Sequence, residues 1–302
     1  MSNSDAKPMV NILGLMTGSS ADGLDLCLVN FTGEGRDPDF EVLFSHEIPY
    51  PRQFQLCFRN PLELNDEEIA ELDNKLGIWF ANEINKLDLK IDFIASHGQT
   101  IKHEPPHFTL QIGNPQYMAE AIQCPVIYDF RTADLEQGGQ GAPLIPIVDQ
   151  YLLQQDNSDV LALNIGGIAN LTIVPGQHNS APLLAWDTGP GNTLIDKAVR
   201  LFSHDILNYD EGGDLAAQGK INHKLLDELL KHEFYQRTPP RSAGQEQFGK
   251  TYFQHILKQF NPRNDQEFKD LIHTLTVLTA KTITESINSL SLKYSPASMF
   301  VG

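Results

Sequence analysis

The sequence is poor in cysteine, in basic residues and in long apolar runs. Its three cysteines, Cys27, Cys57 and Cys124, are widely separated and form no Cys-x-x-Cys pair. We therefore expect reduced core thiols, and neither a disulfide framework nor a zinc or redox centre. The apolar runs are too short to cross a bilayer, and the N-terminus lacks the basic and apolar regions of a signal peptide. These absences predict a cytoplasmic protein with no membrane partner.

Acidic residues outnumber basic ones. The chain has 39 Asp and Glu against 22 Lys and Arg, a formal net charge of −17. This charge repels nucleic acid, and no basic patch in the sequence overrides it, so we expect no nucleic-acid partner. With 41% hydrophobic residues and 18 scattered prolines among 302 residues, the chain is typical of a globular protein with two domains.

The first half alternates strand and helix patterns. A long helix is expected after Asn65, which with Glu68 has the spacing of a capping box, and a shorter one begins at Asn114-Pro115. Strands are expected at residues 10–16, 24–31, 40–48, 91–96, 108–113 and 125–130. The first three favour an antiparallel meander, and the alternation as a whole predicts an α/β core.

The second half repeats the opening pattern after a glycine-rich break, EQGGQGAP (136–143). We place the domain boundary a few residues before this loop, which gives domains 1–132 and 133–302. Strands are expected at 160–165, 168–174, 183–186 and 299–301, and helices at 193–202, 222–232, 246–260 and 265–290. The recurrence of strand, small-residue turn and strand predicts two similar domains.

The turn between the first two strands, in GLMTGSSADGLD (14–25), is rich in groups that hold anions and metals. Backbone N–H groups at Gly18, Ser19, Ser20 and Gly23 can converge on phosphate oxygens, and the carboxylates of Asp22 and Asp25 suit a hydrated Mg²⁺. A hairpin turn with polar filler is an equal alternative. The turn is neither a Walker A sequence nor a dinucleotide fingerprint, because no Gly-Lys-Ser/Thr follows and the next element is a strand.

The second turn, NIGGIAN (164–170), is by itself more typical of a structural hairpin than of a ligand site. Paired with the first turn, it favours binding. Two such loops, one in each half of a duplicated α/β chain, are the arrangement of the actin-like ATPase and sugar-kinase clan, whose nucleotide lies in the cleft between the halves.

Asp187 closes an apolar strand and is followed by a sharp turn, Thr188-Gly-Pro-Gly191. Strand ends are where α/β sheets hold their chemistry, and a carboxylate there can take a proton from a hydroxyl or water aligned with a γ-phosphate. The alternative is that Asp187 caps the following helix, and the two roles can coexist.

Polar residues after the strands at 91–96 and 125–130 are substrate candidates. His97, His103 and His107 have no zinc-site spacing, so substrate contact by the segment His97 to Thr100, which includes Gln99, is favoured over a metal. Arg131 and Asp134 can hold a polar or anionic substrate, with a plain ion pair as the alternative.

The segment TPPRSAGQEQFG (238–249) predicts a rigid turn before a helix. Glu246 in it is either functional or a first-turn acid favoured by the helix dipole.

These motifs together resemble the anhydro-N-acetylmuramic acid kinase family of bacterial cell-wall recycling. The similar stretches are MTGSSADGLD, SHGQT, QIGNP, DFRTADLEQGGQGAPL, NIGGIANLT, WDTGPGN and TPPRSAGQEQF. They run from residue 14 to 248 in the family order and are highly specific together. One departure is mild: the first loop of the family usually reads Met-Ser-Gly-Thr-Ser, and here Thr17 and Ser19 exchange the hydroxyl types.

The resemblance implies a two-domain actin-like (ribonuclease H-like) ATPase fold with an interdomain cleft. It implies a kinase that uses ATP and Mg²⁺ to open 1,6-anhydro-N-acetylmuramic acid with water and phosphorylate O6, with Asp187 as the base that activates the water. By the same resemblance the nucleotide would be held by Gly18, Ser19, Ser20, Ala21, Asp22, Gly23, Leu24, Asp25, Gly166 and Gly167. Asp22 would reach Mg²⁺ through water. The sugar would contact His97, Gln99, Thr100, Arg131, Asp134 and Asn192.

Two other functions are open: an actin-like kinase for another sugar, and a catalytically silent binding protein that kept the fold. Relatives are commonly homodimers, so a homodimer is possible. Family members are expected to continue beyond Gly302 with a glycine-rich adenine-side loop, which predicts weak ATP binding and no activity for this chain alone.

Overall fold

The computed structural model describes residues 9–18, 23–33, 38–58, 61–290 and 294–302. The chain divides into two compact units, Met1–Gly141 and Ala142–Gly302, each described by itself below. The division falls later than the boundary expected between residues 132 and 133. Glycines of the 136–143 loop bond back to the first unit, since the Gly141 N–H donates to Asp134 Oδ2 over 2.7 Å and the Gly139 N–H to the Asp134 carbonyl over 2.8 Å.

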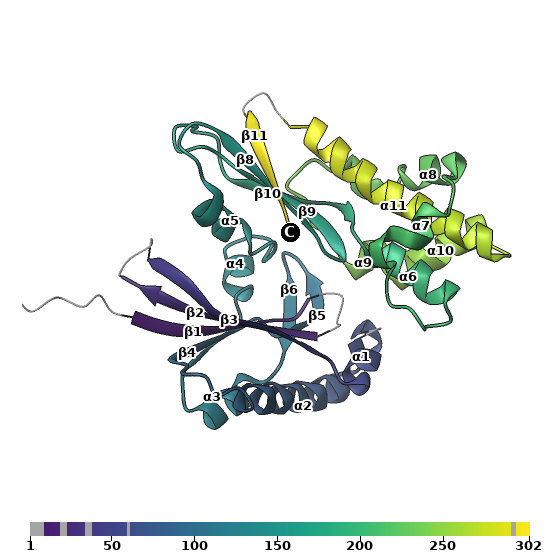
Figure 1. Cartoon of the computed structure of the whole chain (residues 1–302). Helices are drawn as coiled ribbons and strands as arrows, with labels where there is room; N and C mark the ends of the chain where they lie inside the picture. Colours follow the sequence, from purple (N-terminus) through teal and green to yellow (C-terminus); the bar gives the residue numbers. More distant parts are fainter. Residues whose placement is uncertain (1–8, 19–22, 34–37, 59–60, 291–293) are drawn as a thin grey trace, which may run out of the picture. The chain divides into compact units, whose positions relative to one another are not determined.

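The first unit is a five-stranded sheet with a separate hairpin (Figure 1). Its elements are β1 (Met9–Met16), β2 (Gly23–Thr32), β3 (Asp39–Pro49), α1 (Arg52–Phe58), η1 (Pro61–Glu63), α2 (Asp66–Asn85), β4 (Phe93–Ser96), β5 (Gln99–Glu104), β6 (Phe108–Ile112), α3 (Pro115–Ile122), β7 (Val126–Ile127) and α4 (Thr132–Glu136). The sheet order is β3-β2-β1-β4-β7, with β1 to β3 antiparallel and β4 and β7 parallel to β1. Strands β5 and β6 pair only with each other.

Helix α2 packs its apolar face against this sheet. The expected capping box is present, because the Glu68 N–H donates to Asn65 Oδ1 over 3.0 Å and the Asn65 N–H to Glu68 Oε2 over 2.9 Å. Leu76 and Phe80 of α2 are fully buried against strand residues such as Leu24. A Cβ on Gly77 would collide with the backbone of Asn114, so glycine lets the QIGNP motif lie directly on the helix.

The second unit has a four-stranded sheet and a group of helices. Its elements are α5 (Pro146–Leu153), β8 (Asp159–Ile165), β9 (Ile168–Val174), β10 (Leu184–Pro190), α6 (Thr193–Phe202), η2 (Glu211–Gly213), α7 (Asp214–Ala217), α8 (His223–Leu229), η3 (Glu233–Gln236), α9 (Gln245–Phe248), α10 (Lys250–Phe260), α11 (Asp265–Asn288) and β11 (Pro296–Val301). Within the described residues, no helix is both long and apolar enough to cross a membrane.

The second sheet repeats the topology of the first. Its order is β10-β9-β8-β11, with β8 to β10 antiparallel and β11 parallel to β8, which matches β3-β2-β1-β4 strand for strand. This duplicated meander with a parallel fourth strand is the arrangement of the ribonuclease H-like fold, so the predicted α/β class and the predicted echo between the halves are confirmed. The turn β1–β2 and the turn β8–β9 occupy the same topological position. The interdomain cleft stays a prediction.

A buried carboxylate ties the second sheet together at the start of β8. Asp159 is 5% exposed. Its Oδ1 accepts from the Gly176 N–H and Asn179 Nδ2, both at 2.9 Å, and its Oδ2 accepts from the Ser295 N–H at 2.6 Å. Burial alone would raise the pKa of Asp159, but these hydrogen bonds outweigh it and lower the pKa.

We expect Asp159→Asn to lower the free energy of unfolding by about 2 kcal/mol at neutral pH, because an amide cannot accept from all three groups. The contribution of a carboxylate with a lowered folded pKa is present above its unfolded pKa of about 3.9 and disappears as the pH falls through the folded value. Urea denaturation at neutral and at acidic pH measures both effects, with the exposed Asp156→Asn as control. Equal stability of the two variants at neutral pH contradicts the prediction.

Candidate active site

The start of the first turn is held by the segment after β4. Thr17 is 2% exposed, and its Oγ1 donates to the Gly98 carbonyl over 2.7 Å. Gln99, 3% exposed, donates from Nε2 to the Gly18 carbonyl over 3.3 Å and accepts from the Tyr50 hydroxyl over 3.3 Å. The SHGQT motif thus holds the start of the first turn through hydrogen bonds. Gln99, which was predicted to contact the substrate, positions this turn.

The remainder of the first turn is described only from Gly23 onward. Ser19, Ser20, Ala21 and Asp22 lie outside the described residues, and so does the predicted water-mediated contact of Asp22 with Mg²⁺. At Gly23 a Cβ would lie 2.6 Å from the Ile48 carbonyl oxygen, so glycine permits close approach to β3. Leu24 is fully buried in the core, so only its main chain can serve a ligand, whereas Asp25 is exposed.

The second turn and the turn after β10 form one structure. The Gly166 carbonyl accepts from the Asn192 N–H over 2.9 Å, and the Gly167 carbonyl accepts from the Gly191 and Thr193 N–H groups over 3.0 and 3.1 Å. A Cβ on Gly191 would collide with the Gly166 carbonyl oxygen. Within the described part of the chain, the N–H groups of Gly166 and Gly167 donate to no other residue. They are therefore donors that a phosphate can use.

Asn192, a predicted sugar contact, belongs to the same structure. It precedes α6, and its side-chain Nδ2 donates to the Ile165 carbonyl over 3.1 Å. Its side chain makes no capping bond to the helix. A sugar contact by Asn192 stays a prediction.

Asp187 lies in the middle of β10 and not at a strand end as predicted, because the strand continues to Pro190 past a break in the β9–β10 register between Asp187 and Gly189. Because α6 begins at Thr193, Asp187 is not the helix cap, and that alternative is wrong. Its Oδ2 accepts from the Ala243 N–H over 2.6 Å. Burial raises the pKa of Asp187 to about 7; Glu246 adds to the rise, while the Ala243 N–H and Arg241 oppose it. A carboxyl with such a pKa exchanges a proton readily near neutral pH.

In the first unit, buried His97 and half-buried Arg131 form a hydrogen-bonded pair. Arg131 donates from Nε and Nη2 to His97 Nε2 over 3.1 and 3.0 Å, so Nε2 is unprotonated and Nδ1–H donates to the Gly98 carbonyl over 2.7 Å. Burial, reinforced by the Arg131 cation, lowers the pKa of His97 to about 4. The histidine is neutral at physiological pH, and it orients the guanidinium without cancelling its charge.

Asp134 and Thr100 have other partners. Asp134 accepts from the Gly141 N–H, and a Cβ on Gly139 would collide with its carboxyl group, so Asp134 shapes the glycine-rich loop. Among the described residues Arg131 makes no ion pair with Asp134. Thr100 Oγ1 accepts from Gln111 Nε2 over 3.4 Å on the β5–β6 hairpin. Direct sugar contacts by these residues stay predictions.

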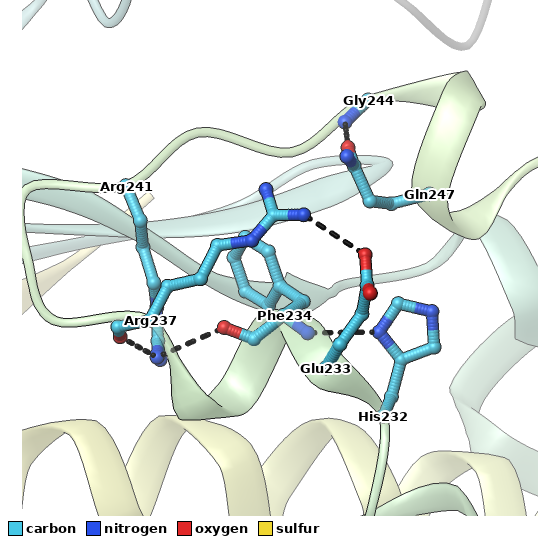
Figure 2. A network of polar contacts seen from close by, with 7 residues as sticks. All are labelled: His232, Glu233, Phe234, Arg237, Arg241, Gly244 and Gln247. Carbon is cyan, nitrogen blue, oxygen red and sulfur yellow. Dashed lines mark hydrogen bonds and ion pairs between the residues drawn. The ribbon is translucent and has the colours of Figure 1, made fainter.

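Sequence reasoning overlooked Arg241, although it lies in the motif TPPRSAGQEQF. Its Nε donates to the Asp187 carbonyl over 3.2 Å. Its guanidinium lies 4.7 Å from the centre of the Phe234 ring (Figure 2). The specificity of the motif was the available signal, but nothing local in the sequence shows that it folds onto β10.

The comparisons with known proteins decide the family. The family described as "Anhydro-N-acetylmuramic acid kinase" matches residues 10–302. The chain belongs to the anhydro-N-acetylmuramic acid kinase family. It is 38% identical to an anhydro-N-acetylmuramic acid kinase of Caldanaerobacter subterraneus, over 94% of this chain and 76% of that protein. It is 40% identical to another of Francisella tularensis subsp. novicida, over 90% of this chain and 74% of that protein.

Solved structures similar to this family member include a glucokinase from an Antarctic psychrotroph and a ROK hexokinase from Thermus thermophilus. The glucokinase is 11% identical with a TM-score of 0.30, covering 97% of this chain and 82% of that chain. The hexokinase is 12% identical with a TM-score of 0.27, and the match covers 89% of this chain and 98% of that chain.

The predicted use of Mg²⁺ stays a prediction. In the described residues there is no group of three or more His, Cys, Asp and Glu side chains that could hold a metal ion. Mg²⁺ that arrives with a nucleotide is held by one or two carboxylates together with phosphate oxygens and water, so such a group is not required. The free N–H donors of Gly166 and Gly167 fit the phosphate part of this arrangement.

Proposed function

We propose that this chain is an ATP-dependent kinase that opens 1,6-anhydro-N-acetylmuramic acid with water and phosphorylates O6. The products are N-acetylmuramic acid 6-phosphate and ADP, in peptidoglycan recycling. Family membership supports the substrate and the phosphotransfer. The observation that carries the mechanism is the Asp187 carboxylate, fixed within β10 by the Ala243 N–H and buried enough to act as a base.

Asp187 acts in its ionised form. The Ala243 N–H holds Oδ2, which leaves Oδ1 to accept a proton from the water that attacks C1 of the sugar. As the C1–O6 bond breaks, O6 takes the γ-phosphoryl group, so the leaving oxygen needs no proton. A base whose pKa lies near the working pH gives the best combination of ionised fraction and proton affinity.

Phosphate binding is assigned to the two equivalent turns. Gly166 and Gly167 supply N–H donors in the second unit, and the Gly18–Asp25 loop is assigned the same task in the first because it occupies the same topological position. Mg²⁺, when bound, would neutralise phosphate charge, with Asp22 reaching it through water.

Sugar binding is assigned to Arg131, oriented by His97. The proposed substrate carries a carboxylate on its lactyl group, and a guanidinium is the side chain best suited to bind a carboxylate through two donors. Because the imidazole partner is neutral, Arg131 keeps its charge for that carboxylate. The remaining site predictions, the cytoplasmic location and the possible homodimer form part of the same proposal.

The decisive experiment is incubation of the protein with ATP, Mg²⁺ and 1,6-anhydro-N-acetylmuramic acid in ¹⁸O-water. Mass spectrometry is expected to find one ¹⁸O atom at C1, none in the transferred phosphate, and one ADP per product. Unlabelled product incubated in ¹⁸O-water corrects for exchange at the anomeric centre.

Two results contradict the proposal. Label in released inorganic phosphate, with none at C1, would mean that water attacks phosphorus instead of C1. Equal turnover of glucose or N-acetylglucosamine would favour the alternative of a kinase for another sugar. Calorimetry with ADP and Mg²⁺ separately tests the silent binding alternative, which predicts no heat of binding.

A further inference from the structure

Arg241 links Asp187 in the middle of β10 to the end of the 3₁₀ helix η3. Its Nη1 donates to the carbonyls of Phe234 and Arg237 over 3.4 and 2.8 Å (Figure 2) and to the carbonyl of Tyr235 over 3.2 Å. The carbonyls of Tyr235 and Arg237 lie at the helix end, which leaves them without intrahelical partners, whereas the Phe234 carbonyl also accepts from the Arg237 N–H over 3.2 Å. The side chain is also packed on the Phe234 ring. The guanidinium is therefore fixed from one side by three acceptors and an aromatic face.

On its other side Arg241 is bonded to Asp187 in both directions. The Asp187 N–H donates to the Arg241 carbonyl over 2.9 Å, and Arg241 Nε donates to the Asp187 carbonyl over 3.2 Å. Two residues further on, the Ala243 N–H binds the Asp187 carboxylate itself. The main chain and the side chain of Asp187 are thus both placed by the segment 241–243.

We propose that Arg241 is a positioning residue for the Asp187 carboxylate: its guanidinium fixes the segment whose Ala243 N–H orients that carboxylate, and its charge favours the ionised base. Among the described residues every hydrogen-bond acceptor of Arg241 is a backbone carbonyl, so no carboxylate partner neutralises its charge. Lysine cannot replace it, because an ammonium group lacks the planar fork that reaches β10 and η3 together.

The charged groups that act on Asp187 are few. Arg241 lowers the pKa of Asp187 and Glu246 raises it. Across β9 the register partner is the uncharged Asn170. Tyr235 lies close to Gly189, where burial raises the pKa of its hydroxyl far above the neutral range. Arg237 pairs with Glu233 over 3.0 Å on the surface and does not act on Asp187.

The test is a direct titration of Asp187 by ¹³C NMR in protein labelled at the aspartate carboxyl carbon, with the resonance assigned by Asp187→Asn. Arg241→Gln is expected to raise the pKa of Asp187 by about 1, because a nearby positive charge is lost. Arg241→Lys should raise it less, since the charge stays but its position is no longer fixed. Arg237→Gln is the matched control in the same segment and should leave the titration unchanged.

The inference rests on the proposed role of Asp187, but the titration reports on Arg241 whether or not the protein turns over the sugar. The inference is supported if the pKa of Asp187 rises from the wild type through Arg241→Lys to Arg241→Gln. The inference is overturned if the pKa of Asp187 in Arg241→Gln equals that of the wild type, or if Arg237→Gln raises this pKa by the same amount. If circular dichroism shows that Arg241→Gln does not fold, Arg241→Lys decides: an unchanged titration there overturns the inference.

Discussion

Asp187→Asn is expected to lower kcat about 10³-fold, the range in which a positioned general base contributes. Asparagine can still accept the Ala243 N–H through its amide oxygen, so the fold and the affinity for nucleotide should hold. It cannot take a proton from the attacking water. Steady-state rates of ADP release and calorimetry with ADP and Mg²⁺ measure the two quantities separately.

The same variant defines the pH dependence. Since the base must be ionised and burial raises the pKa of Asp187 to about 7, kcat of the wild type should rise with pH through about 7 and then level off. The residual rate of Asp187→Asn should lack this rise. Asp156→Asn, an exposed aspartate in the same unit, should behave as wild type. A flat profile in the wild type, or a variant that keeps more than a tenth of the rate, rejects Asp187 as the base.

Arg131→Met is expected to weaken binding of the anhydro sugar about 100-fold, equal to about 2.8 kcal/mol, because each tenfold change corresponds to 1.4 kcal/mol. The loss follows from removing the half-buried cation that His97 orients for the substrate carboxylate. Nucleotide affinity should not change. Calorimetric titration with the sugar measures the effect, and His97→Gln should give a smaller loss in the same direction.

An analogue without the lactyl group, 1,6-anhydro-N-acetylglucosamine, supplies the control. The wild type should prefer the muramic acid compound, and Arg131→Met should lose that preference. If the variant weakens both compounds equally, Arg131 supports the structure of the site and does not bind the carboxylate.

Much of the fold was predictable because its signals are local. The capping box at Asn65 and Glu68 and the Asn-Pro start of α3 each place a helix within a few residues, and both are confirmed. In the strands of the two meanders, apolar and polar residues alternate or the residues are continuously apolar, and turn residues bound each strand. The pairing of these strands follows from their short connections. The duplicated sheet order could be anticipated from the repeated strand, small-residue turn and strand pattern.

The elements that the sequence did not reveal are short or polar. Helices α1 and α5 span 7 and 8 residues, too few for a helical period to stand out. Strand β5, QTIKHE, has mostly polar residues and exists because it pairs with β6. Strand β7 is only Val126–Ile127, shorter than the predicted run.

The site was predicted less completely than the fold. The motif WDTGPGN singled out Asp187 as the expected end of an apolar strand before a glycine turn, whereas the structure continues the strand to Pro190. Arg241 and Ala243, the partners of Asp187, lie on a distant segment, and no periodicity shows which distant backbone N–H will face a carboxylate. Similarly, the sequence presented His97 as a substrate contact, while the structure shows it holding Arg131.

The hydrogen-bonded turns of the second unit bear on the alignment of the two proposed steps, the attack of water on C1 and the transfer of the phosphoryl group to O6. The amides of Gly166 and Gly167 lie in the turn before β9, and Asp187 lies on β10, which pairs with β9; residues 191–193 bond to the carbonyls of that turn. A phosphoryl group bound by those amides, as proposed, would therefore have its distance from the proton acceptor set within the second unit.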